Sequence, residues 1–306
     1  MIRRPPRSTQ GVSSAASDVY KRQAMVNSSE VDGRPPDNLD FDVIIIGAGI
    51  SGMYQLYRLR ERDFRIRVFE AGTGVGGTWY WNRYPGARFD SESYSYAYSF
   101  SRELLDEWHW TEQFSPQPET ERYLNYVADK FDLRRDIQFS ARVASAHFDE
   151  EGSNWIITLE DGQHYRARFI ITAVGPLSAP TMPKIEGIQD YKGEAYHTGL
   201  WPKEPVRFED KRVAVIGTGA TGIQTIQEVA KSVGHLTVFQ RRPNWCTPLQ
   251  NRKIGKAEMQ EIRENYEEIF RRCEKTVSCF LHNPCLLYTS DAADDTPCVD
   301  LGGRRI

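Results

Sequence analysis

The stretch that most constrains this chain is FDVIIIGAGISG, at residues 41–52. Apolar residues typical of a β-strand, Val43–Ile46, run directly into a GxGxxG pattern, and a helical pattern continues from Ser51 to about Arg62. This order of strand, tight glycine turn and helix N-terminus predicts the βαβ unit that binds a dinucleotide. The first glycine permits the turn, the second lets the backbone approach the pyrophosphate, and the third lets helix and strand pack closely.

A second glycine turn repeats the first one. RVAVIGTGATG, at residues 212–222, aligns with residues 42–52 at a constant offset of 170 residues. The offset persists to the next strand, where Val68–Glu70 matches Val238–Gln240. Two glycine turns that each keep their downstream strand in register predict an α/β chain with two Rossmann-like dinucleotide-binding domains.

The residues that end the two second strands point to different ligands. Glu70 lies 23 residues after Gly47, close to the spacing of ~20 expected for a carboxylate that binds ribose hydroxyls. The second unit has Gln240 there, followed by Arg241 and Arg242. A carboxylate repels a ribose 2′-phosphate, whereas arginine binds one bidentately. The first unit therefore favours FAD and the second NADP, unless Glu70 is an ordinary exposed residue and the arginines form a solvated turn.

Residues 76–90, GGTWYWNRYPGARFD, are dense in glycine and aromatic residues. This composition is compatible with an ordinary packed aromatic loop. It is equally compatible with a loop that lies along a flat cofactor, because small residues allow close backbone approach and aromatic rings exclude water. Arg88 and Asp90 either place charge beside that cofactor or pair with each other.

Further patterns complete the expected fold. Residues 119–131 have helical periodicity, and residues 143–173 contain strand-like runs that predict a β-meander closing the first domain. A proline-containing linker follows, at residues 176–183. Residues 257–277 carry apolar side chains at spacings of three and four, which predicts one amphipathic helix that packs on a partner.

Composition excludes several classes of protein. The net charge of −3 gives no basic stripe for nucleic acid, and no apolar run approaches the ~20 residues that span a membrane. All five cysteines lie at or beyond Cys246, which argues against a disulfide scaffold, a redox dithiol beside the first glycine turn, or a metal site. We expect a cytoplasmic protein, and the sequence does not indicate its oligomeric state.

The two ends of the chain are expected not to be native. Residues 1–23 and 285–306 resemble translated sequencing-adapter read-through more closely than an organellar targeting segment. Residues 24–40, rich in Ser, Asp, Gly and Pro, are expected to form a disordered leader. The expected protein begins near Ala24 and is cut off near Pro284.

One further segment narrows the class of protein. Residues 191–202, YKGEAYHTGLWP, resemble the FxGxxxHxxxWP fingerprint of Baeyer–Villiger monooxygenases, with tyrosine in place of phenylalanine. Residues 76–90 resemble the second signature of that family, GGxWxxxxYPGxxxD, at every fixed position. The resemblance implies an FAD-binding domain at 41–178, an NADP-binding domain at 179–247 and the start of a helical insertion at 248–284. The fingerprint positions are Tyr191, Gly193, His197, Trp201 and Pro202.

The resemblance also implies the chemistry. NADPH reduces FAD, and a flavin peroxide then inserts one oxygen of O2 next to the carbonyl of a small ketone, which gives an ester or lactone. His197 is a lone histidine between two cofactor motifs, and we expect it to couple domain movement rather than to transfer protons. Arg88 and Asp90 would act as the catalytic pair facing the nicotinamide.

The resemblance places both cofactors on named residues. Those implied for FAD are Gly47, Gly49, Ser51 and Gly52 at the pyrophosphate, Glu70 at the ribose, and Thr78, Trp79, Tyr80, Trp81, Asp90 and Tyr96 on the flavin side. Those implied for NADP are Gly217, Thr218, Gly219, Ala220, Thr221 and Gly222 at the pyrophosphate, and Arg241 and Arg242 at the 2′-phosphate.

Two alternatives stay open at this point. One is a flavin-containing monooxygenase that oxygenates nitrogen or sulfur, which would convert amines or sulfides but not ketones. The other is a non-catalytic dinucleotide-binding fragment, because the family's peroxide-stabilising arginine is expected beyond Pro284. On that reasoning we expect the 306-residue chain to lack ketone-oxygenating activity, with FAD retention in doubt. A disulfide reductase is disfavoured because the required cysteine pair is missing.

Overall fold

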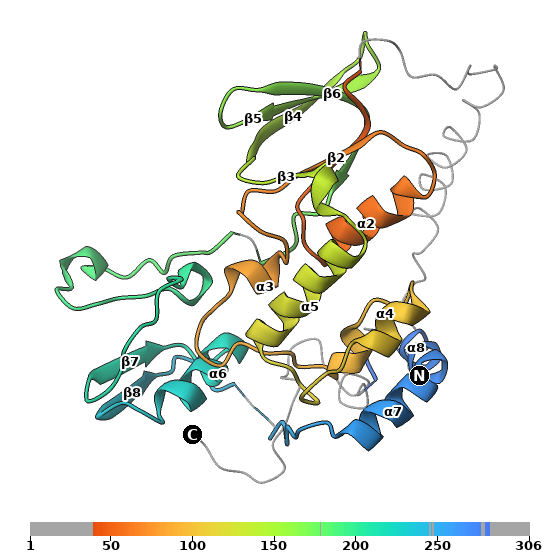
Figure 1. Ribbon diagram of the computed structural model, residues 1–306. Helices are drawn as coiled ribbons and strands as arrows, with labels where there is room; N and C mark the ends of the chain where they lie inside the picture. Colours follow the sequence, from red (N-terminus) through yellow and green to blue (C-terminus); the bar gives the residue numbers. More distant parts are fainter. Residues whose placement is uncertain (1–38, 178, 245, 247, 277–278, 282–306) are drawn as a thin grey trace, which may run out of the picture. The chain divides into compact units, whose positions relative to one another are not determined.

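The computed structural model describes residues 39–177, 179–244, 246, 248–276 and 279–281. The two expected non-native ends and nearly all of the expected leader lie outside the described residues. The chain divides into two units, residues 1–39 and residues 40–306. Everything below concerns residues 40–306 (Figure 1), within which "first unit" and "second unit" mean the dinucleotide-binding units that begin at Phe41 and at Arg212.

The main sheet has six strands in the order β3-β2-β1-β6-β5-β4 (Figure 1). Its central strand β1 reads as an apolar run because both faces are covered, and Ile44 and Ile45 are fully buried. Strands β2 and β6 flank β1 in parallel, and β4, β5 and β6 form the predicted antiparallel meander. The bounds are β1 (Phe41–Ile46), β2 (Ile66–Phe69), β3 (Ile137–Gln138), β4 (Val143–Asp149), β5 (Asn154–Leu159) and β6 (His164–Thr172).

Helices connect these strands. The helix after the first glycine turn is α2 (Ile50–Arg60), and the helix predicted at 119–131 is α5 (Gln117–Lys130). Between them, the aromatic loop contains the single-turn helix α3 (Thr78–Trp81), and α4 (Arg102–Glu107) follows. Short 3₁₀ helices lie at Ser93–Tyr96 (η1), Arg134–Asp136 (η2), Ile188–Asp190 (η3) and Thr198–Leu200 (η4).

The repeat in the sequence is a repeat in the structure. The second unit consists of β7 (Arg212–Ile216), α6 (Ala220–Val229) and β8 (His235–Phe239), with β7 and β8 paired in parallel. Val43 lies opposite Ile66, and Val213 lies opposite Leu236, so the two strand pairs share one register at the same offset of 170 residues. The predicted α/β fold class is confirmed by this topology.

The amphipathic segment predicted as one helix over 257–277 forms two helices, α7 (Lys256–Glu264) and α8 (Tyr266–Cys273). Asn265 separates them with φ −108° and ψ 9°, and its side-chain amide donates to the Glu261 carbonyl oxygen. Such local side-chain bonds compete with the helical ladder. The apolar face packs on the core of this chain rather than on a partner. Its buried residues there are Met259, Ile262, Tyr266, Ile269 and Cys273. Val277 lies outside the described residues.

The core that receives these helices is rich in tyrosine. Burial raises the pKa of the phenol groups of Tyr96, Tyr98, Tyr123 and Tyr266 above the ordinary value of 10. Above that pH the unfolded chain releases phenol protons that the folded chain retains. The unfolded state then binds fewer protons than the folded state, so stability falls as the pH rises.

We therefore expect the free energy of unfolding to fall above about pH 10, by about 1.4 kcal/mol per pH unit for each phenol that stays protonated. Tyr123→Phe should reduce that slope by one such increment, although it also removes the acceptor for the Tyr98 N–H (2.8 Å). Urea unfolding between pH 8 and pH 11 measures the slope. The exposed Tyr191 supplies the control Tyr191→Phe. An unchanged slope in Tyr123→Phe would contradict this expectation.

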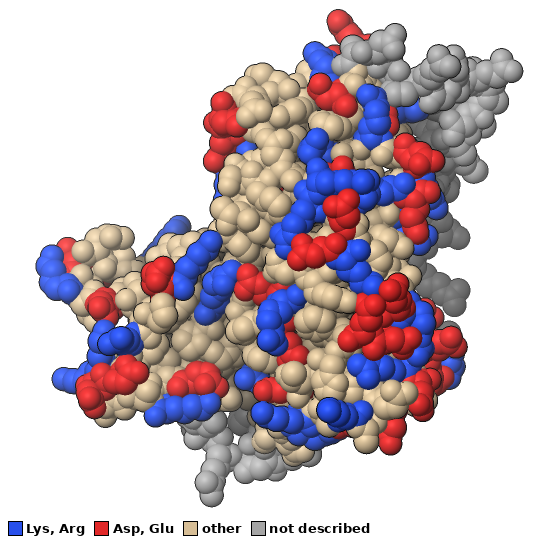
Figure 2. Space-filling view, viewed as in Figure 1, with Lys and Arg blue, Asp and Glu red and all other residues tan. Residues whose placement is uncertain are grey.

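In the part of the chain that the structure describes, none of the helices is both long and apolar enough to span a membrane. Figure 2 shows Lys and Arg interspersed with Asp and Glu over the face in view.

Candidate functional site

The first glycine turn is fixed by steric necessity. Gly47 has φ +101°, a conformation that side chains rarely tolerate, and its N–H donates to the Phe69 carbonyl oxygen (2.8 Å). A Cβ on Gly52 would lie 1.9 Å from the Gly47 carbonyl oxygen. The start of α2 therefore packs directly on the turn, with its N-terminus beside the end of β1, where an anion is favoured.

Glu70 is buried, with 4% of its surface exposed, so it is not an ordinary exposed strand-end residue. One carboxylate oxygen accepts the N–H of Ala48 in the glycine turn, and the other accepts the N–H of Gly72, both at 2.7 Å. Glu70 thus ties the end of β2 to the glycine turn. A carboxylate offers about four acceptor positions, so capacity for ribose hydroxyls remains.

The aromatic loop is fastened to the same turn. The Gly76 N–H donates to the Ala48 carbonyl oxygen (3.0 Å), which leaves both backbone groups of Ala48 bonded. Gly77 lies directly against Gly49, because a Cβ on Gly77 would meet the Gly49 Cα at 2.8 Å. The loop and the glycine turn are therefore one packed structure, and Thr78 begins α3 from this point.

The aromatic side chains of the loop separate into two groups. Trp79 donates its indole N–H to the Tyr96 hydroxyl (3.1 Å), and both rings contact Phe89. Tyr80 instead packs closely against three glycines. A Cβ on any of Gly72, Gly74 or Gly76 would come within 3.4 Å of Tyr80 atoms. Trp81 is 38% exposed.

Arg88 and Asp90 engage different partners. The Arg88 guanidinium forms an ion pair with Glu112 (3.4 Å), whose carboxylate also accepts from the Asn251 amide (2.6 Å). Asp90 is exposed and accepts from the side-chain amide of Gln224 in α6 (3.2 Å). Both residues of the predicted pair thus border the second dinucleotide unit through Gln224.

The second glycine turn copies the first. Gly217 also has φ +101°, and a Cβ on Gly222 would lie 2.5 Å from the Gly217 carbonyl oxygen. A Cβ on Gly219 would meet nothing within 4 Å. The backbone there is open to a ligand. Ala220 and Thr221 form the first residues of α6.

Thr218 and Gln240 occupy the positions that correspond to Ala48 and Glu70. The Gln240 amide donates to the Thr218 hydroxyl (3.3 Å), which donates to the Arg242 carbonyl oxygen (3.4 Å). The same tie between turn and strand end is therefore made without a carboxylate. Arg241 and Arg242 follow β8 directly and are exposed. This positive charge favours the binding of a ribose 2′-phosphate over the binding of an unphosphorylated ribose.

The fingerprint segment forms a local structure of its own. His197 Nδ1 accepts the Gly199 N–H (3.1 Å) and caps η4, which supports a role in shaping the linker. The Tyr191 ring covers Gly193, because a Cβ there would meet the Tyr191 hydroxyl at 2.3 Å. Trp201 packs against Tyr196 and Phe208. Pro202 continues the segment.

Lys203, directly after the fingerprint, is a contact that the sequence analysis missed. Its ammonium donates to the Tyr80 hydroxyl (3.0 Å) and lies 5.0 Å from the centre of that ring. Burial opposes ionisation of Tyr80, but the hydrogen bonds from Lys203 and Thr73 outweigh it and lower the pKa of Tyr80 below its ordinary value. The aromatic loop thus contacts the residue that directly follows the fingerprint segment. No residue pattern in the sequence signals it.

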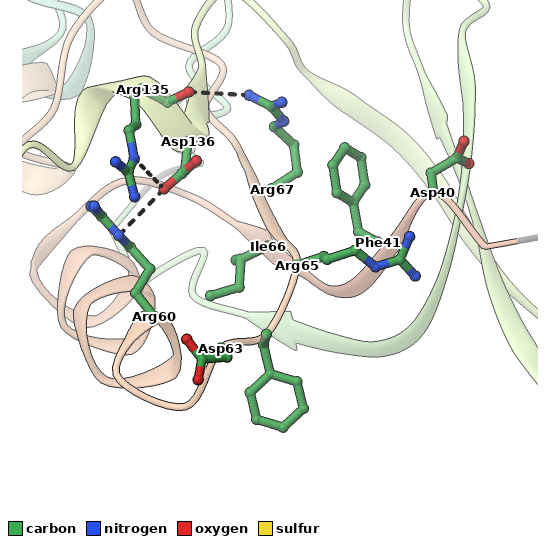
Figure 3. Close-up of a pocket in the computed structure, with 10 residues that line it drawn as sticks. Asp40, Phe41, Arg60, Asp63, Arg65, Ile66, Arg67, Arg135 and Asp136 are labelled. Carbon is green, nitrogen blue, oxygen red and sulfur yellow. Dashed lines mark hydrogen bonds and ion pairs between the residues drawn. The ribbon is translucent and has the colours of Figure 1, made fainter. Parts of the chain in front are cut away.

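A cavity of about 500 Å³ lies elsewhere (Figure 3). It is lined by the starts of β1 and β2, whereas the glycine turns follow the ends of such strands. Its arginines include Arg60 and Arg135, which both pair with Asp136. Ligands of open α/β sheets bind beyond the carboxyl ends of the strands, so this cavity carries none of the predicted roles. Within the described residues, no cluster of three His, Cys, Asp or Glu could hold a metal ion.

Residues 41–260, which contain both glycine turns and the aromatic loop, match one family model, flavin-binding monooxygenase-like. The chain belongs to this family. This match confirms the prediction, made from residues 76–90 and 191–202, that the chain belongs to a family of flavin-binding monooxygenases.

Two curated proteins with different names resemble the chain. Acetone monooxygenase (methyl acetate-forming) of Gordonia sp. (strain TY-5) is 47% identical over 228 residues, which is 74% of this chain and 43% of the relative. Phenazine N-monooxygenase of Lysobacter antibioticus is 44% identical over 235 residues, or 76% of this chain and 43% of the relative.

Solved structures resemble the chain as well. The structure titled oxidized steroid monooxygenase bound to NADP is 47% identical, with a TM-score of 0.77, over 80% of this chain and 47% of that one. The chain spans less than half the length of these relatives.

Proposed function

We propose that the protein is an FAD- and NADPH-dependent monooxygenase that inserts one oxygen of O2 next to a ketone carbonyl, giving an ester or lactone. The observation that carries this proposal is the loop 76–90, which is packed on one glycine turn and bonded to the helix of the other. A relative named for forming methyl acetate from acetone supports the ketone as substrate. That conversion places an oxygen between a carbonyl carbon and a methyl group.

Both cofactors fit the residues present. The close packing at Gly47 and Gly52 and the buried carboxylate of Glu70 suit FAD in the first unit. The open space beside Gly219 and the exposed guanidinium groups of Arg241 and Arg242 suit NADP in the second. When bound, the two cofactors supply the redox chemistry and the activation of O2.

The side chains of this chain would position and shield those groups. Ser51, at the start of α2, would join the turn around the FAD pyrophosphate. Trp79 and Tyr96, held by their mutual hydrogen bond, would exclude water from the flavin side, with Thr78, Tyr80 and Trp81 shaping the same loop. Arg88 and Asp90 would present one positive and one negative charge beside the nicotinamide.

We further propose the domain division at 41–178 for FAD, 179–247 for NADP and 248–284 for the start of a helical insertion, and a cytoplasmic location. The interaction of α7 and α8 with the core of the first unit supports a segment that begins by packing on the FAD domain.

The test is oxygen transfer by the protein expressed from its intact gene. With NADPH, ¹⁸O2 and cyclohexanone, one ¹⁸O atom should appear in a lactone. Conversion of an amine or sulfide with no conversion of any ketone tried would contradict the proposal.

N-oxygenation is the second candidate, and the 44% identity to a phenazine N-monooxygenase favours it. Supplying phenazine beside cyclohexanone in the same assay separates the two functions, because only one of them yields a lactone.

A further inference from the structure

Gln224 bridges the second dinucleotide unit and the aromatic loop with a single side chain. It lies in α6, the helix that begins at the second glycine turn. Its amide oxygen accepts the Tyr84 hydroxyl (2.9 Å), and its amide nitrogen lies within donating distance of the Asp90 carboxylate (3.2 Å) and the Arg88 carbonyl oxygen (3.3 Å). One amide thereby spans the loop from Tyr84 to Asp90.

The backbone of α6 fits the same loop closely. Gly86 has φ +83°, and a Cβ there would lie 2.4 Å from the Gln224 carbonyl oxygen and 2.8 Å from the Glu228 side chain. Only glycine permits this approach. The helix and the turn at Tyr84–Ala87 are therefore in direct contact, and the Gln224 amide adds directional bonds to that contact.

The loop is also anchored by contacts that do not involve α6. Arg88 pairs with Glu112, and the Gly76–Gly77 start of the loop is packed on the first glycine turn. The contacts from α6 therefore fall on a loop that is held both at Gly76–Gly77 and at Arg88.

We propose that Gln224 is a positioning residue that holds Arg88 and Asp90 in register with the nucleotide bound at the second glycine turn. This inference rests on the proposed function, because it requires a nucleotide at residues 217–222. Occupancy of that turn restrains α6, and Gln224 passes the restraint to residues 82–90.

Hydrogen–deuterium exchange with and without NADP⁺ tests this. In the unsubstituted chain, NADP⁺ should slow exchange at 217–222 and at 82–90. In Gln224→Met, which keeps the size and removes the amide, protection at 217–222 should persist while protection at 82–90 is lost. Without nucleotide, exchange at 82–90 should be about tenfold faster than in the unsubstituted chain, as expected for losing about one net hydrogen bond.

Two further variants complete the experiment. Gln227→Met makes the same chemical change on the exposed side of α6 and should behave like the unsubstituted chain. Gln224→Glu keeps the acceptor for Tyr84 but sets a carboxylate against Asp90, so it should also speed exchange at 82–90. It serves as the test if Gln224→Met does not fold.

The outcomes are distinct. Protection at both segments in Gln224→Met overturns the proposed role of Gln224 and leaves the nucleotide site intact. Absence of protection at 217–222 in the unsubstituted chain overturns the nucleotide site and the inference with it.

Discussion

Replacing Gly52 with alanine is expected to destabilise the chain by about 3 kcal/mol or more. The new methyl group would lie 1.9 Å from the Gly47 carbonyl oxygen. That backbone cannot move away freely, because the Gly47 N–H is bonded to Phe69 and a Cβ of its own would strike Ala173. Urea unfolding followed by circular dichroism measures the loss.

The matched control is Gly219→Ala, the same change at an open position. Gly219 has φ −69°, which alanine tolerates, and nothing lies within 4 Å of the added Cβ. Its stability should stay within about 0.5 kcal/mol of the unsubstituted chain. Equal losses in both variants would mean that the close packing of α2 on the turn does not determine the stability of the first unit.

Removing the two arginines after β8 is expected to abolish the preference for NADP⁺. Each charge-assisted bond to a phosphate is worth about 1.5–3 kcal/mol, so Arg241→Ser with Arg242→Ser should weaken NADP⁺ binding by about 100-fold or more. NAD⁺ lacks the 2′-phosphate, so its affinity should change little. Isothermal titration with both nucleotides measures the ratio.

Gln240→Glu tests the same charge preference by adding a negative charge instead of removing positive ones. It gives the second unit the carboxylate that the first unit has at Glu70, next to the place proposed for the 2′-phosphate. NADP⁺ should bind more weakly and NAD⁺ should not. Parallel weakening of both nucleotides in either variant would show that these residues support the fold rather than select the ligand.

Much of the fold could be predicted because the repeat fixes it locally. Strand, turn and helix follow each other within about 20 residues. Gly47 and Gly217 both have φ +101°, which residues with a side chain rarely adopt. The carboxylate at Glu70 was predictable for the same reason, since the end of β2 always lies beside the turn in this unit.

The contacts that the sequence did not reveal join segments far apart in the chain. Gln224 and Tyr84 are separated by 140 positions, and Lys203 and Tyr80 by 123. Such pairs depend on how a loop packs, which periodicity does not encode. The break at Asn265 was missed because the apolar spacing continues across it from α7 into α8.

We propose two separate dinucleotide sites in this chain, the first for FAD and the second for NADP. Isothermal titration of the chain with FAD and NADP⁺, in both orders, tests it most directly. We expect one equivalent of each nucleotide to bind with no competition, and Gly219→Ala should weaken the binding of NADP⁺ alone. Competition between the two nucleotides, or weaker FAD binding in Gly219→Ala, would contradict it.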